Sequence, residues 1–225
     1  KKGNLGVSAF FSGNAQLNSR TVNSLNKETF NVDRTNISQL FQTGNSDFKR
    51  GGYQSGLNFN WTLSKKDELS ASLGLNHFGN DNQGLTAITQ SQQDAGNAPF
   101  TILSNRNSLN HFSSNSTDYS LAYKRTFNKE DQELDILYTE SASNNKVNFS
   151  QQQDYSMEAF PTSGLISSNS GKNVEKNLSL DYTYPFNKKT SLETGVKTIF
   201  ETLNSHTLSD TLAGNGSYLP NANQT

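Results

Sequence analysis

Few side chains in this sequence have the type and spacing that catalysis or metal binding requires. The three histidines are His77, His111 and His206, and no pair of them has the spacing of a metal-binding motif. His77 and His111 flank one predicted loop and could approach each other, although solvated loop residues are the simpler interpretation. Residues 79–84 (GNDNQG) lack the closing glutamate of an EF-hand calcium loop, so we predict an ordinary turn there.

Motifs for nucleophilic or phosphate chemistry are also missing. The sequence contains no Gly-x-Ser-x-Gly elbow and no phosphate-binding glycine loop. It has no cysteine, so no thiol nucleophile or disulfide is available. Glu193 and Lys197 are four residues apart, about 13 Å along a strand, so they are not a pair, and we expect them to line a polar lumen or to contact a plug. We therefore predict no enzyme, no catalytic residue, no cofactor and no metal site.

The composition argues against an ordinary soluble domain. Only 31% of the 225 residues are hydrophobic, the formal net charge is −1, and mean hydropathy is −0.75. Aromatic residues make up 10% of the sequence, which disfavours disorder. The polar residues are mostly uncharged, and the net charge near zero disfavours nucleic-acid binding. No run of 18 apolar residues predicts a transmembrane helix. No signal peptide opens the sequence, so a secreted protein would require a start further upstream.

The dominant pattern is an alternation of apolar and polar residues, which predicts strands with two different faces. Tyr53, Leu57 and Trp61 alternate with Gln54, Asn58 and Thr62 along one segment. A charged turn follows, and the alternation then resumes, as in a β-hairpin. The same unit recurs twice, and a single strand precedes all three. The predicted strands cover residues 5–11, 53–63, 69–75, 119–127, 134–138, 178–184 and 192–200.

The connections between these strands alternate in length. Three are short and charged, at 64–68, 128–133 and 187–190, whereas the others span about 20–50, 79–116 and 140–175, and another starts at 203. Short periplasmic turns and long extracellular loops are typical of outer-membrane barrels. Residues 29–40 and 146–152 also alternate weakly, which indicates strands that project beyond the membrane. We predict an all-β fold, an antiparallel transmembrane β-barrel segment of about seven strands, with 1–225 forming part of one barrel domain.

Aromatic residues lie at both ends of the predicted strands, as in the aromatic girdles of a membrane barrel. The eight steps from Tyr53 to Trp61 span about 26 Å, or roughly 20 Å of height at a tilt of about 40°. The alternative is that they form the core of a β-sandwich, which would not need such long loops. The predicted girdle residues are Tyr53, Trp61, Tyr119, Phe127, Tyr138, Tyr184, Phe186 and Phe200.

One hairpin carries a family resemblance. Residues 181–197 (DYTYPFNKKTSLETGVK) resemble a hairpin of the outer-membrane β-barrel family of TonB-dependent receptor-like proteins from Bacteroidetes, and residues 2–11 resemble a strand of that family. The resemblance implies the cell outer membrane and a barrel of about twenty-two strands, of which seven would be about a third. It further implies a plug domain, a TonB complex and a surface lipoprotein as partners, besides outer-membrane lipid. No nucleic-acid partner is expected.

Three functions remain open from the sequence. The first is energised uptake of an unidentified ligand through a gated barrel. The second is a barrel without transport that serves as a structural subunit of an envelope assembly. The third is a soluble β-rich adhesin or carbohydrate-binding module. An odd count of seven strands would leave open sheet edges, so the barrel hypotheses require that this chain be a piece of a larger barrel.

Overall fold

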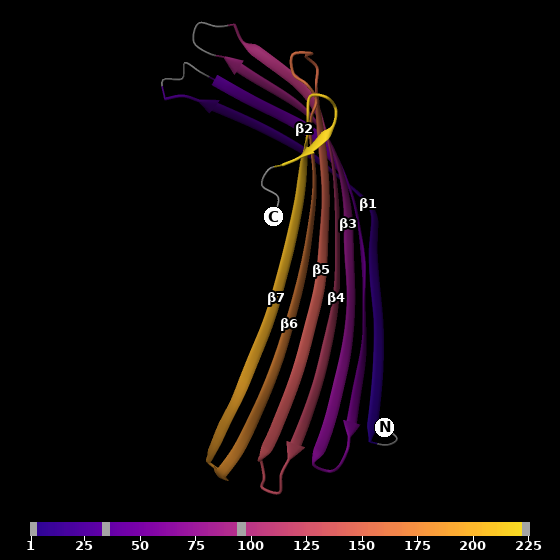
Figure 1. Ribbon diagram of the computed structural model, residues 1–225, viewed down its shortest axis with the longest axis vertical. Coiled ribbons are helices and arrows are strands. Elements are labelled where there is room, and N and C mark those ends of the chain that lie inside the picture. The colour runs from indigo at the N-terminus through magenta and orange to yellow at the C-terminus, as the bar shows by residue number, and fades with distance from the viewer. Residues whose placement is uncertain (1–3, 33–36, 94–97, 222–225) are drawn as a thin grey trace.

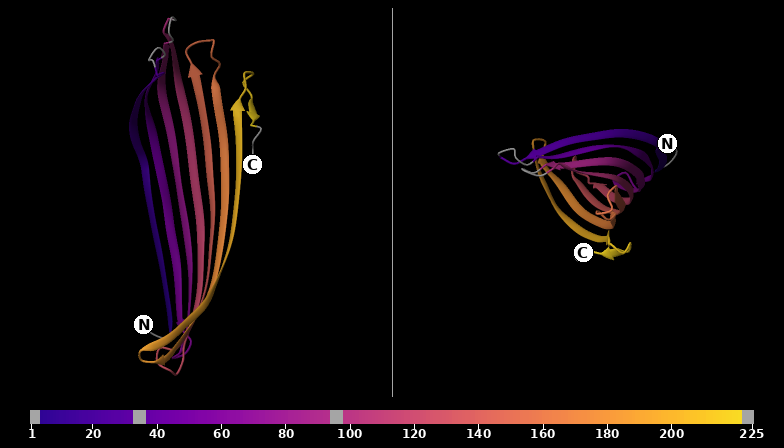
Figure 2. Two further views of the ribbon diagram at one scale, coloured as in Figure 1. Left: turned by 90° about the vertical axis from the view of Figure 1, so that its left-hand side faces the viewer. Right: turned by 90° about the horizontal axis from the view of Figure 1, so that it is seen from above.

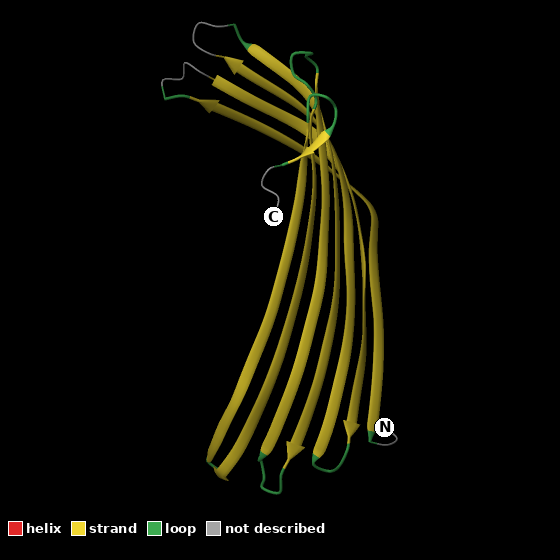
Figure 3. Cartoon of the chain, viewed as in Figure 1, coloured by secondary structure: helices red, strands yellow, loops and turns green. Residues whose placement is uncertain are grey.

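The computed structural model describes residues 4–32, 37–93 and 98–221. They form one antiparallel sheet whose eight strands neighbour each other in sequence order (Figure 1). Figure 3 shows strands and loops alone, and within the described ranges no helix could cross a membrane. The strands are β1 (Leu5–Phe30), β2 (Ile37–Thr62), β3 (Asp67–Gln93), β4 (Phe100–Thr126), β5 (Glu133–Tyr155), β6 (Ser163–Asn187), β7 (Thr190–Leu212) and β8 (Tyr218–Pro220).

The all-β antiparallel fold predicted from the alternation is confirmed. The three charged segments form the short turns, because β2 joins β3 through residues 63–66, β4 joins β5 through 127–132, and β6 joins β7 through 188–189. The turns lie together at one end of the sheet (Figure 1). This end is called the short-turn end below.

The predicted long loops are wrong in extent. Their residues continue the strands, so that β1 to β7 are 23 to 27 residues long. Residues 79–84, predicted as a turn, lie inside β3. These segments are rich in polar residues and show little alternation. Their ladders nevertheless continue, and side chains form hydrogen bonds across them, as Ser168 Oγ does to Asn148 Oδ1 at 2.9 Å.

The strand count also differs from the prediction. The short β8 pairs with residues 210–212 of β7 at the far end of the sheet, which makes eight strands in the described part of the chain. The argument from an odd strand number therefore does not hold. Within the described ranges β1 pairs with β2 alone, so the sheet is open along β1.

The strands are staggered at the short-turn end. Thr62 pairs with Glu68, and Glu68 pairs with Lys124, but β4 runs two residues beyond Lys124. Thr183 lies level with the end of β4, and β6 continues four residues further. A shift of six residues over four strands, at ~3.3 Å per residue and ~4.8 Å between strands, corresponds to a tilt of about 45°. The sheet is accordingly twisted and curved (Figure 2).

The ends of β1 to β4 far from the short turns bend sharply to one side (Figure 1). In β1 the register shifts between Gln16 and Ser19, where one extra residue forms a bulge. Along 80–88 of β3 and 102–112 of β4, the even-numbered side chains are less exposed than the odd-numbered ones. The bend is therefore concave on the even-numbered face of these strands.

The sheet has almost no core of its own. Among the described residues Ile88 is the buried hydrophobic residue and Ser104 the buried polar one, at 6% exposure each, and both lie within the bend. Ser104 Oγ accepts a hydrogen bond of 3.0 Å from Gln153 Nε2. Many apolar side chains elsewhere in the sheet are exposed. Something outside the chain must therefore cover them, because packing within the chain does not.

Candidate functional site

The half of the sheet near the short turns has one apolar face. The register places the odd-numbered residues of β1 to β4 and the even-numbered residues of β5 to β7 on this face. Many of them are large and exposed, for example Leu57 at 51% and Val196 at 62%. We call this surface the belt. It includes Leu5, Val7, Leu57, Phe59, Leu69, Leu73, Leu121, Ile136, Leu178, Leu180 and Val196.

Four of the predicted girdle aromatics lie at the short-turn edge of the belt. Trp61 packs edge-on against Phe59, with ring centroids 6.5 Å apart. Phe127 packs edge-on against Tyr182 at 6.1 Å, while Tyr184 contacts Tyr182 and Phe186 at 6.5 and 5.2 Å. The ammonium of Lys129 lies 4.2 Å from the centroid of the Tyr184 ring.

The other four predicted aromatics lie further up the same face. Tyr53 stacks with Phe11 at 6.2 Å and contacts His77 at 5.3 Å. Tyr119 and Phe200 are exposed, at 48% and 65%. Tyr138 donates a hydrogen bond of 2.6 Å to Glu140 Oε2. Four further aromatic residues lie on the belt face but are not among the predicted girdle residues, although the alternation places them on the apolar face of their strands: Phe11, Phe59, Tyr123 and Tyr182.

The opposite face, called the inner face below, is polar and carries charges near the short turns. Lys124 Nζ pairs with Glu133 Oε2 at 2.6 Å and lies 3.9 Å from Asp135 Oδ2. Glu193 and Lys197 lie on this face, opposite Thr183 and Ser179, four residues apart along β7. The remaining charges of this end are Glu68, Asp118, Glu175, Asp181 and Glu201.

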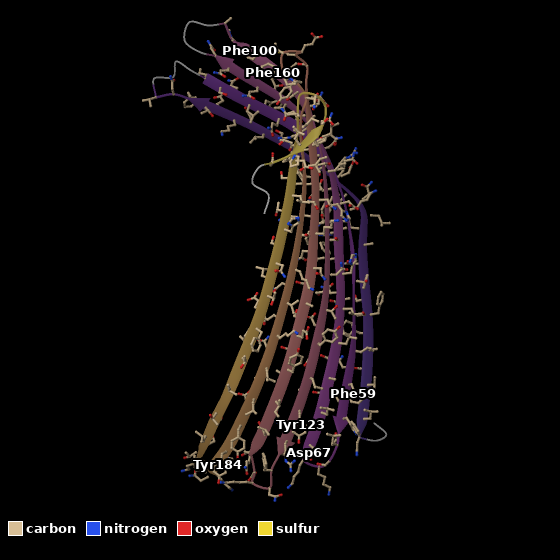
Figure 4. The ribbon with its side chains drawn as sticks, viewed as in Figure 1. Phe59, Asp67, Phe100, Tyr123, Phe160 and Tyr184 are labelled. Atoms are coloured by element: carbon tan, nitrogen blue, oxygen red, sulfur yellow. The ribbon has the colours of Figure 1, made fainter. Side chains whose placement is uncertain are left out.

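Asp67 fixes the turn between β2 and β3 at the short-turn edge. Its carboxylate accepts hydrogen bonds from Ser64 Oγ at 2.5 Å and Tyr123 Oη at 2.7 Å, and Arg125 Nη1 lies 3.4 Å away. These two hydrogen bonds, aided by the nearby cations, hold the pKa of Asp67 below its ordinary value. Figure 4 shows Asp67 and Tyr123 at this end and Phe100 with Phe160 at the other.

A second ion pair lies just beyond the bulge of β1. Arg20 donates to both carboxylate oxygens of Asp47, at 2.7 and 2.8 Å. This bidentate contact lowers the pKa of Asp47 and raises that of Arg20. The two residues are direct partners in the shifted register, so the contact supports the pairing that the bulge creates.

The histidines do not form a site. His77 Nδ1 contacts Asn115 Oδ1 at 2.8 Å, and His111 Nδ1 contacts Asp81 Oδ1 at 2.5 Å. His77 faces Asn115 on β4. His111 lies four residues away from Asn115 on β4, which is about 13 Å along the strand. The two rings therefore do not approach each other, and both residues lie within strands and not in a loop. Within the described ranges no group of three potential ligands could hold a metal ion.

Comparison with known proteins identifies the architecture. Residues 125–225 match the model of the outer membrane protein beta-barrel family. The sheet and this match together make the chain a segment of an outer-membrane β-barrel. Its place is therefore the cell outer membrane, as predicted. No curated protein matches the sequence.

Similarity of this outer-membrane barrel chain to solved structures is low. The ferric yersiniabactin uptake receptor FyuA from Yersinia pestis is 8% identical, with a TM-score of 0.32, over 100% of this chain and 43% of that one. The pyoverdine-bound FpvA of P. aeruginosa is 7% identical, with a TM-score of 0.26, over 94% and 40%. The chain thus spans less than half the length of these two receptors.

The belt gives the height of the barrel wall that faces lipid. An apolar band ~25 Å tall, crossed at a tilt of about 45°, corresponds to about eleven residues per strand. Counted from the short turns, this reaches residue 51 in β2, 144 in β5 and 176 in β6. Tyr53 lies close to that upper edge, and Trp61 lies at the lower one. The strands therefore extend more than ten residues beyond the lipid on the extracellular side.

Proposed function

We propose that this chain forms part of the wall of a TonB-dependent outer-membrane receptor that takes up a polar ligand. The observation that carries the proposal is the contrast between the belt, which is mostly apolar, and the inner face, which is mostly polar and carries most of the charges near the short turns. A polar interior of this kind suits a water-filled passage. The likeness of residues 181–197 to TonB-dependent receptor-like proteins supports the finer assignment.

The open edge of β1 supports a larger barrel. In hydrocarbon an unpaired strand would leave its backbone N–H and C=O groups without partners, which is energetically unfavourable at several kcal/mol per group. We propose that further strands close the barrel and that a plug gates it. A TonB complex and a surface lipoprotein are the proposed partners of the whole receptor.

Cysteine labelling tests the gated lumen, because the chain has no native cysteine. Lys197 lies on the inner face and its neighbour Val196 on the belt. In the full-length protein in outer membranes, a water-soluble maleimide should label Lys197→Cys slowly and Val196→Cys hardly at all. Deleting the plug should accelerate labelling of Lys197→Cys alone. Equal rates with and without the plug would contradict a gated passage.

Dependence on TonB separates transport from a structural role. The periplasmic domain of TonB should bind the full-length protein reconstituted in phospholipid nanodiscs, with a Kd that a synthetic TonB-interaction peptide competes away. A barrel that serves only as a structural subunit would neither bind TonB nor contain a plug. That result would replace uptake with the envelope-assembly function.

A further inference from the structure

A basic hollow lies on the lipid-facing side of the wall, just above the belt. It has a volume of about 450 Å³ and is formed by β4 to β7. Its cationic side chains are Lys146 and Lys172, with His206 beside them, and its other lining residues are Asn, Ser and Gly. None of the lining residues is acidic.

The register brings these side chains together from distant parts of the sequence. Lys146 on β5 faces Ser170 on β6, and Ser170 faces His206 on β7. Lys172 lies two residues beyond Ser170 on the same face, which makes it a diagonal neighbour of Lys146 at about 7–8 Å. Three groups able to bind an anion thus lie across two strand spacings of ~4.8 Å.

The two lysines are not neutralised by the protein. The ion pairs of the described residues involve other side chains, and Lys146 and Lys172 are exposed. Lys176 lies four residues closer to the short turns on β6. It differs from the two lysines because its Nζ lies 3.8 Å from Glu140 Oε1. Lys176, whose charge is balanced by Glu140, thus lies at the upper edge of the belt. The unpaired Lys146 and Lys172 lie above it.

The height of the hollow matches the level of lipid head groups. The belt ends near residue 144 on β5 and residue 176 on β6, as counted from the short turns. Lys146 lies two residues above that edge, and Lys172 lies four residues above it, about 9 Å higher at the tilt of the sheet. Asn144 and Asn204 are the ladder partners of Lys172 on the two neighbouring strands and add amide donors.

We propose that this hollow binds the phosphate groups of an anionic lipid head group in the outer leaflet. Lysine ammonium groups bind phosphate as point charges, and the neighbouring amides and hydroxyl supply hydrogen bonds. The acyl chains of the same lipid would lie against the belt directly below. The proposal follows from the placement in the outer membrane and does not depend on transport.

The test uses the full-length protein in mixed micelles of neutral detergent and phosphatidylcholine, titrated with fluorescent lipid A, a bisphosphorylated glycolipid. The double substitution K146Q/K172Q should raise the Kd about thirtyfold, as expected for two lysines close to a membrane surface. The matched control, K188Q/K189Q, removes two lysines from the short turn between β6 and β7 and should leave the Kd unchanged. Removing the phosphates from lipid A should reproduce the loss in the unmodified protein.

Charge-retaining variants separate binding from folding. K146R/K172R should keep the affinity, and heat-modified electrophoretic mobility should show that every variant is folded. An unchanged Kd for K146Q/K172Q would overturn the proposal. So would displacement of lipid A by millimolar inorganic phosphate alone, because that would indicate a site for a free anion.

Discussion

Substitution of Leu73 by arginine tests the assignment of the two faces most directly. Leu73 lies on β3 between Leu57 and Tyr119, its ladder partners across the belt. It is six residues from Asp67, which places it about 14 Å above the short-turn edge, close to the middle of a band ~25 Å tall. An arginine at the bilayer midplane destabilises a membrane barrel by about 2–4 kcal/mol.

The neighbouring Ser72 supplies the matched control. It points to the inner face, between Asn58 and Ser120, and an arginine there reaches water. The Ser72→Arg variant should therefore lose no more than about 0.5 kcal/mol, as is usual for solvated surface sites. Leu73→Met, which keeps the volume and adds no charge, should cost less than about 1.5 kcal/mol.

The measurement is urea unfolding of the full-length protein from phosphatidylcholine vesicles, followed by tryptophan fluorescence. The expected difference between Leu73→Arg and Ser72→Arg corresponds to a factor of about 10 to 1,000 in the unfolding equilibrium constant. Equal losses for the two arginine variants, or a larger loss for Ser72→Arg, would refute the assignment of the belt to lipid.

Three further predictions concern single contacts. Tyr123→Phe should raise the pKa of Asp67 toward its ordinary value, as measured by carbonyl NMR titration, because one of its two strong hydrogen bonds is lost. Since that pKa is depressed in the folded protein, the stability from Asp67 is present at neutral pH and disappears as the pH falls through the folded value. Gly52→Ala should destabilise the sheet by about 1–3 kcal/mol in urea, since its Cβ would lie 2.5 Å from a carbonyl oxygen of the facing strand. A double-mutant cycle of Glu140→Gln and Lys176→Gln should give a coupling of about 1 kcal/mol at most.

The strands of the belt were predictable because lipid and water impose opposite requirements on their two faces. Leu57, Phe59 and Trp61 alternate with asparagine and threonine, and this contrast set both the strand type and the side that is apolar. The charged turns were predictable for a related reason, since lysine and glutamate interrupt the alternation. Both signals arise because neighbouring residues in the sequence face different surroundings, lipid on one side and water on the other.

The extracellular halves of the strands were not predictable because that difference disappears there. Residues 79–84 are polar on both faces, so alternation no longer separates strand from loop there. Their structure comes from ladder hydrogen bonds that continue upward from the belt. The bulge after Gln16 has no signal of its own, since the extra residue is recognised only by its pairing with β2.

The basic hollow was predictable in part, because the number of residues between each lysine and the belt decides which face of the sheet the lysine is on. Lys172 is six residues from Leu178, and Lys146 is eight residues from Tyr138, so an even number of steps separates each lysine from the belt. The pairing of β5 with β6 has no register shift between them. The alternation that places leucine and tyrosine against lipid therefore also decides which face carries the lysines. A one-residue bulge, such as that in β1, would have turned them to the inner face. The uninterrupted ladder of β5 and β6 is thus the physical requirement for a lipid-facing phosphate site.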